Sequence, residues 1–385
     1  MSKRQPVIWD ADPHTIAKIT ILKGYLNAWF RILGQRRRGE TILYVDGFAG
    51  PGYYRNHDEG SPLAAVRAAH GSIKELGERF VAQQISCIFI EGRRDRFDAL
   101  KLVLAPFVGK PKLEIHPYNT TFAEGIVKAQ AEHAELFNRK HPLFVFADPF
   151  GGKGIPFGTF VDCMKGEASE LLINLDADGI GRMFAAENNN HRDQQLTELF
   201  GDDSWKTALT VGSDLKTLSV QILDLYKRRL MAIGVRFVWP FAMRGVKDLL
   251  NYYLVFATKH PLGMEKMKES MRTIDKDRTY TFSDAHSRQG VLFRNDQPEE
   301  YADAMFRYFN GKAVTPDEAL AYALSETPFS NAKGMLAVLE KIGRLRVEIV
   351  EGENRKAGSF PEGKVRALHF GRFEVRSVQG ELEID

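Results

Sequence analysis

Cysteine is scarce in this chain of 385 residues, which contains two, Cys87 and Cys163. Both lie in apolar segments and form neither a disulfide framework nor a metal site, so we expect a reducing, cytoplasmic compartment. No stretch approaches 18 apolar residues, and the N-terminal MSKRQPVIWDADPH lacks the apolar run of a signal peptide. The sequence therefore predicts neither a membrane span nor a secretory signal.

An excess of charge of one sign is also nearly absent. There are 53 Lys and Arg residues against 50 Asp and Glu, which leaves a net charge of +3. This small excess is compatible with a nucleic-acid partner but does not require one. Hydrophobic residues make up 44% of the chain and charged residues 27%, as in globular proteins with a large core. The length predicts two or three domains, and no repeat of fixed period is evident.

Seven short apolar runs rich in β-formers are present, and segments of helical spacing separate most of them. The runs are 41–45, 86–90, 113–116, 143–147, 171–175, 235–239 and 252–258. Near-continuous apolar strands alternating with helices predict a parallel sheet covered on both faces. The gap between the last two runs is too short for a helical crossover, so we expect an antiparallel edge pair. This α/β pattern resembles the Rossmann-like, seven-stranded sheet of class I methyltransferases, whose last strand is antiparallel.

The rest of the chain divides into three parts by composition. A helix with one apolar stripe is expected over 14–33, before the first strand, and completes a domain over 1–272. Residues 273–311 are mostly polar with little period, and we interpret them as an insertion or linker with a helix. Residues 312–385 read as helix, turn, helix and a two-stranded hairpin, which predicts a C-terminal winged helix-turn-helix.

A glycine turn follows the first strand in the sequence ILYVDGFAGPGYYRN. Asp46 closes the strand, and Gly47, Phe48, Gly50 and Gly52 follow in a spacing that differs from the dinucleotide-binding G-x-G-x-x-G. The turn resembles the F-x-G-x-G motif of amino-group methyltransferases, which use S-adenosylmethionine (SAM). The glycines would let the backbone approach the methionine part of SAM. The Asp46 carboxylate could accept from its ammonium group, directly or through water.

The next two strands also end in candidate cofactor residues. Glu91 ends the second strand, where a carboxylate can hold the two ribose hydroxyls. The alternative is a solvated glutamate. Asn119 or Tyr118 could face the adenine after the third strand, and a plain turn is the alternative there.

The fourth strand ends in Asp148, Pro149 and Phe150, at the carboxyl edge of the sheet where ligands bind. The motif resembles the (Asp/Asn)-Pro-Pro-(Tyr/Phe) sequence of amino methyltransferases. In that motif the acid and a backbone carbonyl accept hydrogen bonds from the target amine, while an aromatic ring stacks on the base. This chain departs from the pattern, with Phe150 at the second proline and Gly151 at the aromatic position. A turn that only ends the strand is the alternative.

Other polar residues lie near the same edge. Lys18 or His14 on the leading helix could reach the cofactor, and Lys18 could pair with its carboxylate, although a surface lysine is the alternative. Asn174, Asp176 and Arg182 follow the fifth strand on the rim of the sheet. Arg182 could bind a phosphate or form a rim salt bridge.

The combination of motifs resembles the three-Cys-motif partner protein family. The segments that carry the resemblance are HTIAKITILKGYLNAW, YVDGFAGPGYY with GSPLAA, FADPFGGKGIPF, ELLINL and NYYLVFATKHPLGMEKMKESM. They span most of residues 9–272, and the C-terminal part also fits. The resemblance implies a methyltransferase-like fold and a partner with a cysteine motif related to radical SAM enzymes. This chain has no three-cysteine motif of its own.

Taken together, the residues predict SAM-dependent methyl transfer to an amine of a nucleic acid, with no metal. The C-terminal hairpin would contact DNA or RNA through a wing of four cations, Arg355, Lys356, Lys364 and Arg366. One rival is a SAM-binding module that recognises nucleic acid or a partner protein without turnover. A second rival is an enzyme acting on a small or protein substrate, with the winged helix as a protein-binding wedge.

Overall fold

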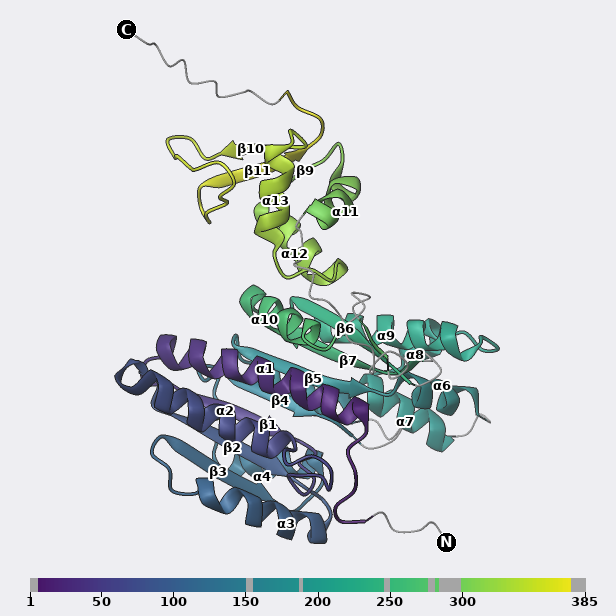
Figure 1. Ribbon diagram of the computed structural model, residues 1–385. Helices are drawn as coiled ribbons and strands as arrows, with labels where there is room; N and C mark the ends of the chain where they lie inside the picture. The colour runs from purple at the N-terminus through teal and green to yellow at the C-terminus, as the bar shows by residue number, and fades with distance from the viewer. Residues whose placement is uncertain are drawn as a thin grey trace. The chain divides into compact units, whose positions relative to one another are not determined.

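The computed structural model describes residues 6–149, 155–186, 190–245, 250–275, 281–283 and 299–374. The chain divides into two compact units, Met1–Val291 and Leu292–Asp385 (Figure 1). The sequence interpretation set its domain boundaries at residues 272 and 311 instead. Among the described residues between those boundaries, one strand joins the sheet of the first unit and one helix belongs to the second.

The first unit contains an eight-stranded sheet in the order β3-β2-β1-β4-β5-β7-β6-β8. Its strands are β1 (Thr41–Asp46), β2 (Gln84–Ile90), β3 (Leu113–Tyr118), β4 (Leu143–Ala147), β5 (Ser169–Leu175), β6 (Phe237–Arg244), β7 (Leu250–Thr258) and β8 (Thr281–Ser283). β1 to β5 pair in parallel, whereas β7 pairs antiparallel with both β5 and β6. All seven predicted strands are found, and the antiparallel seventh strand is confirmed. β8 was not predicted.

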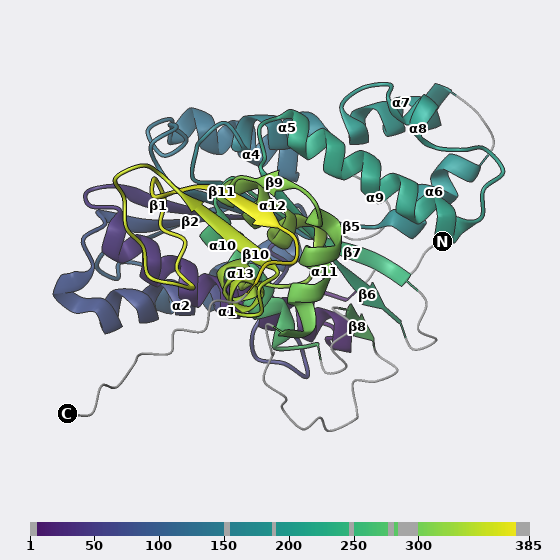
Figure 2. The ribbon, with the colours of Figure 1, turned by 90° about the horizontal axis from the view of Figure 1, so that it is seen from above.

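Helices cover both faces of this sheet. They are α1 (Pro13–Arg36), α2 (Ser61–Leu76), α3 (Arg94–Leu104), α4 (Phe122–Glu132), α5 (Phe157–Cys163), α6 (Ala177–Ala185), α7 (Asn190–Phe200), α8 (Trp205–Ala208), α9 (Leu215–Ala232) and α10 (Pro261–Arg272), with 3₁₀ turns at Gly77–Arg79 and Ala105–Phe107. α1 packs against α2 and α10 on one face, and α4, α5 and α9 lie on the other (Figure 2).

The leading helix α1 is held by its first turn and by its apolar stripe. Asp12 caps it, because its Oδ1 accepts a hydrogen bond from the Thr15 amide at 2.7 Å, and Pro13 occupies the first turn. Leu22, Leu26 and Trp29 are buried, as the spacing predicted. This packing fixes the position of α1 against the sheet.

A buried glutamate joins three elements at the amino edge of the sheet. Glu170 of β5 accepts hydrogen bonds from the hydroxyls of Tyr25 (2.5 Å) and Thr258 (2.8 Å) and from the Trp29 side chain. Gly263, in the first turn of α10, packs against this carboxyl so closely that a Cβ would overlap it. The donors satisfy the carboxyl, so Glu170 ties α1, β7 and α10 together.

Over its described residues, 299–374, the second unit has three helices and a small antiparallel sheet. Its elements are α11 (Glu299–Phe309), β9 (Ala313–Val314), α12 (Pro316–Glu326), α13 (Ala332–Lys341), β10 (Leu345–Ile349) and β11 (Val365–Phe370). The strand order is β10-β11-β9. Thr315 and Glu318 form a capping box that starts α12. The two helices and the hairpin expected after Thr315 are present, and α11 and β9 precede them.

Candidate functional site

Polar side chains end four neighbouring strands at the carboxyl edge of the large sheet. They are Asp46, Glu91, Asp148 and Asn174, which close or follow β1, β2, β4 and β5. β1 pairs with both β2 and β4, so the strand order reverses beside it. Open α/β sheets bind ligands outside the carboxyl ends at such a switch point. The strand order therefore places the predicted acids together at the expected ligand edge.

Asp46 is fully buried beneath the glycine turn. Its Oδ1 accepts a hydrogen bond from the Phe48 amide at 3.2 Å, whereas Oδ2 is buried and accepts none from any described residue. Burial raises the pKa of this carboxyl to about 7. The Ser61 hydroxyl and the Phe48 amide oppose the rise, and the charges of Asp148 and Glu91 add to it. A buried acceptor with an unused oxygen suits a cationic donor.

The three glycines of the turn have different roles. Gly50 and Gly52 have positive φ, +63° and +87°, which favours glycine at both positions. A Cβ on Gly47 or Gly52 would collide with a packed side chain. A Cβ on Gly50 would have nothing nearer than the Trp9 ring, at 4.0 Å. Of the three, Gly50 is therefore the one that borders open space.

Glu91 connects the turn to the next loop. Its carboxylate accepts from the Gly50 amide at 2.9 Å and from the Arg93 amide at 2.7 Å. The Asn119 side-chain amide donates to the Glu91 carbonyl at 2.8 Å. The Tyr118 hydroxyl donates to Glu132 at 2.8 Å. Glu91 and Asn119 thus stabilise the loops of the site, and each carboxylate oxygen retains a lone pair for a ligand hydroxyl.

A cavity of about 300 Å³ adjoins Glu91. Phe48 and Phe122 supply apolar walls, and Thr120 and Arg96 supply polar ones. The volume of this cavity and the residues that line it suit a cofactor fragment with an aromatic ring. The predicted residues Gly47, Phe48 and Glu91 therefore share one pocket.

The other end of the edge contains a closed polar network. Nζ of Lys18 lies 2.5 Å from Oδ2 of Asp148, and Nδ2 of Asn174 donates to Oδ1 of the same carboxylate at 2.7 Å. The sequence analysis gave Lys18 two alternatives, a partner of the cofactor carboxylate or a surface lysine. In the structure Lys18 is buried and pairs with Asp148. Pro149 is half-buried beside this network, and Phe150 lies outside the described residues.

Three aromatic residues near the site were missed by the sequence analysis. Trp9 packs under the Arg96 guanidinium at 4.2 Å and edge-on against Tyr54 at 5.4 Å. Burial, together with the charges of Asp148 and Asp46, holds the pKa of Tyr54 well above its usual range. Tyr252 lies 5.3 Å from Nζ of Lys18. Tyr54 follows the glycine turn by two residues, which was the one available signal in the sequence.

Asp176 and Arg182, the other two candidates after β5, make their polar contacts within α6. Asp176 caps α6, since its Oδ1 accepts from the Gly179 amide at 2.8 Å. Arg182 pairs with Asp178 one turn earlier on the same helix. Of the two alternatives for Arg182, a phosphate contact and a salt bridge, the structure contains the salt bridge.

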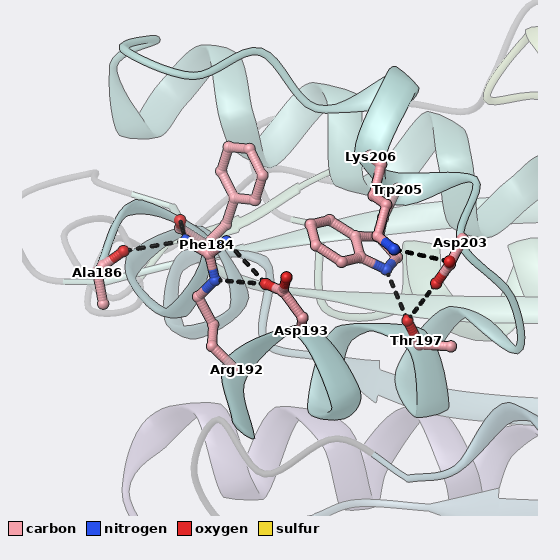
Figure 3. Close-up of polar contacts among 8 residues, drawn as sticks. All are labelled: Phe184, Ala186, Arg192, Asp193, Thr197, Asp203, Trp205 and Lys206. Atoms are coloured by element: carbon pink, nitrogen blue, oxygen red, sulfur yellow. Dashed lines mark hydrogen bonds and ion pairs between the residues drawn. The ribbon is translucent and has the colours of Figure 1, made fainter. Parts of the chain in front are cut away.

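Polar contacts also stabilise the α6–α8 layer (Figure 3). Arg192 donates to the carbonyls of Phe184 and Ala186, both at 3.1 Å, at the end of α6. The Trp205 indole donates to Thr197 at 3.0 Å. These contacts fix the segment that continues directly from Asn174.

In the second unit, three of the four predicted wing cations pair with acids of the same unit. Arg355 pairs with Glu340 of α13, Lys364 with Glu353 at 2.8 Å, and Arg366 with Glu348 at 3.4 Å, whereas Lys356 is exposed. The Gly358 amide also donates to Glu340 at 2.8 Å. The β10–β11 loop is therefore fastened to α13.

In the part of the chain that the structure describes, no three His, Cys, Asp or Glu side chains gather in a way suited to a metal ion. None of the described helices has both the length and the apolar character that crossing a bilayer requires.

No family model and no curated protein matches the chain. Solved structures similar to it include a precorrin-6y C5,15-methyltransferase from Geobacter metallireducens, with a TM-score of 0.29, 11% identity, and coverage of 67% of this chain and 100% of that one. An O-methyltransferase from Bacillus cereus in complex with SAH has a TM-score of 0.34 and 11% identity, covering 65% and 83%. A putative S-adenosyl-L-methionine-dependent methyltransferase from Methanococcus maripaludis has a TM-score of 0.29 and 11% identity, covering 67% and 97%.

Similarity at this level carries no argument about chemistry. The strand order and directions of the chain itself fit the Rossmann-like class I methyltransferase fold.

Proposed function

We propose that the chain is a SAM-dependent methyltransferase that acts on an amino group of a nucleic acid. The observation that carries the proposal is the arrangement of two polar sites along one sheet edge. Asp46, Gly50 and Glu91 form a cradle beside the cavity, and Lys18, Asp148 and Asn174 form a network next to it. The first site suits a cofactor and the second a methyl acceptor.

The cradle fits SAM on three counts. The unused Oδ2 of Asp46 is an acceptor for the cofactor's ammonium group. The open side of Gly50 gives room for the methionine part, and Glu91 with the adjacent cavity would hold the ribose and adenine. When bound, SAM supplies an electrophilic methyl group on a sulfonium, so that methylation of an N–H releases one proton and leaves a neutral thioether.

The nucleic-acid part of the proposal rests on the second unit. Its element order, helix-strand-helix-helix-strand-strand, and its strand order β10-β11-β9 agree with a winged helix. Such domains place a helix and a wing on duplex DNA. Lys356 is exposed and pairs with no acid among the residues that the structure describes, so we assign it the phosphate contact.

A second candidate is a SAM-binding module that recognises a nucleic acid or a partner protein without turnover. Two observations favour it. Both oxygens of Asp148 already accept hydrogen bonds within the chain, and three wing cations pair inside their own unit. A partner with a three-cysteine motif related to radical SAM enzymes would then supply the chemistry.

Label transfer separates the two candidates. The protein is incubated with methyl-labelled SAM and with separate RNA and DNA pools from its host, and the products are digested to nucleosides. The enzyme predicts label on an exocyclic nitrogen, which mass spectrometry identifies. Binding of SAM by calorimetry with no label in either pool would reject catalysis on nucleic acid and support the binding module.

A further inference from the structure

Asn174 has one half of its side-chain amide engaged and the other half unused. Nδ2 donates to Oδ1 of Asp148 at 2.7 Å. Oδ1 is buried and accepts no hydrogen bond from any residue that the structure describes. Most buried carbonyl oxygens in proteins have a partner, so an unused one at a ligand edge indicates that a ligand provides the donor.

The orientation of this amide is set by its neighbours. The oxygen and the nitrogen of this amide are distinguished by the hydrogen-bond network, because the Asp148 oxygen opposite it accepts. Lys18 donates to Oδ2 of Asp148 and holds that carboxylate in place. Asn174 must therefore turn its NH₂ group toward Asp148, which leaves its oxygen facing away.

From this geometry we infer that Oδ1 of Asn174 accepts the hydrogen bond from the methyl-accepting nitrogen. Asp148 is then a positioning residue, which acts by fixing the Asn174 amide. The inference deepens the proposed function and rests on it. It also narrows the substrate class. A ring nitrogen without hydrogen or a carbon centre offers Asn174 no donor, whereas an exocyclic NH₂ group does.

The role of Asp148 changes accordingly. The sequence motif assigned the amine directly to its carboxylate, and here both oxygens already accept from Lys18 and Asn174. The ion pair also leaves no net charge at this end of the edge. The acceptor is the neutral amide of Asn174, and it lies beside the Lys18–Asp148 ion pair. This arrangement favours a neutral amine over a cationic one, because a cation would compete with Lys18 for the Asp148 carboxylate.

The test measures binding with S-adenosylhomocysteine present, so that no reaction occurs. Single-stranded RNA and DNA pentamers carry one central base in matched pairs that differ by the exocyclic amine: adenine and purine, cytosine and 2-pyrimidinone, guanine and hypoxanthine. Wild-type protein is expected to prefer the amino member of one pair at least tenfold. Asn174→Leu should reduce that ratio to about one and leave the affinity for S-adenosylhomocysteine unchanged.

Asp148→Asn provides a second variant that does not depend on the folding of the first. Lys18 would donate to the oxygen of the new amide, so the NH₂ group of that amide would face Asn174. The Asn174 amide would then turn its own oxygen toward residue 148 and away from the ligand. The ratio should again fall to about one, and the double variant should lose nothing more. Asn138→Leu, on an exposed turn, is the control and should keep the wild-type ratio.

The outcomes separate this inference from the proposed function. A preserved ratio in Asn174→Leu or in Asp148→Asn overturns the role of Asn174 and leaves the proposed function standing. If the wild type distinguishes no pair, the amine acceptor and the inference fall together. If S-adenosylhomocysteine does not bind, the cofactor assignment itself fails.

Discussion

The Nζ of Lys18 and Oδ2 of Asp148 lie 2.5 Å apart, although 130 residues separate them in the chain. The pair joins α1 to the end of β4, and the two side chains are only 11% and 19% exposed. Removing one partner of a poorly exposed pair leaves a charge without compensation. The pair therefore stabilises the packing of α1 against the end of β4, and it also lies at the candidate site.

Lys18→Ala should lower the free energy of unfolding by about 1–3 kcal/mol, less than for a fully buried pair because some solvent reaches Asp148. Urea denaturation measures this. Lys101→Ala, which breaks an exposed pair with Asp98 at 3.6 Å, is the control and should change stability by less than about 0.5 kcal/mol. Equal effects of the two substitutions would contradict the role of the Lys18 pair.

Cofactor affinity should depend on the titration of Asp46. Burial raises the pKa of this carboxyl to about 7, so the Asp46 carboxyl of the ligand-free protein is largely protonated at pH 5.5. An ammonium group binds the ionised form, so affinity should rise toward pH 7.5 by up to about tenfold per unit below the pKa. Calorimetry in two buffers should detect release of up to about one proton at the lower pH. Asp46→Asn should abolish the pH dependence of cofactor affinity. If the affinity of the wild type does not change with pH, Asp46 does not bind the ammonium group.

The free protein should be more stable at mildly acid pH because of Glu170. Burial raises the pKa of this carboxyl to about 7, while its hydrogen bonds with Tyr25 and Thr258 oppose the rise. The folded state therefore holds the proton more tightly than the unfolded state. The stabilisation is complete below the unfolded pKa and is lost as pH rises through about 7. Thermal unfolding from pH 5 to 8 should show a steeper loss for wild type than for Glu170→Gln.

Gly263→Ala should destabilise the first unit by about 1–3 kcal/mol, since the added Cβ would overlap the Glu170 carboxyl. Gly71→Ala is the matched control, because Gly71 is an exposed helical glycine with nothing near its missing Cβ. That control should be neutral or stabilising by up to about 1 kcal/mol. Denaturant midpoints compare the two, and a neutral Gly263→Ala would show that the contact relaxes freely.

The wing cations should divide into two kinds. Arg355→Ala removes the partner of Glu340 and should lower the unfolding temperature of the second unit. Lys356→Ala should leave stability unchanged and reduce the salt slope of binding to B-DNA by about 0.9, the contribution of one phosphate. Scanning calorimetry and salt titrations measure both. If Arg355→Ala alone changes the salt slope, the assignment of the two residues is reversed.

The sequence predicted the sheet well because its strands are near-continuous apolar runs that segments of helical spacing separate. β8 was missed because Thr281–Ser283 is a three-residue strand in a polar segment with no period. Asp46, Glu91 and Asp148 could be placed at one edge, since parallel strands end there. The partner of Lys18 could not be found in this way, because it depends on how α1 packs across the sheet. The unused oxygen of Asn174 likewise depends on atoms from α1, β4 and β5 together.

The most direct test of the central claim is the affinity of SAM for wild type, Gly50→Val and Gly39→Val. Gly50 and Gly39 both have positive φ, +63° and +73°, so the two substitutions impose similar backbone strain. Gly39 lies on an exposed turn with nothing near its missing Cβ, whereas Gly50 borders the proposed cofactor site. Calorimetry should give one-to-one binding in wild type and Gly39→Val, and a loss of at least tenfold in Gly50→Val. Absence of binding in the wild type, or equal binding in all three proteins, would contradict the account.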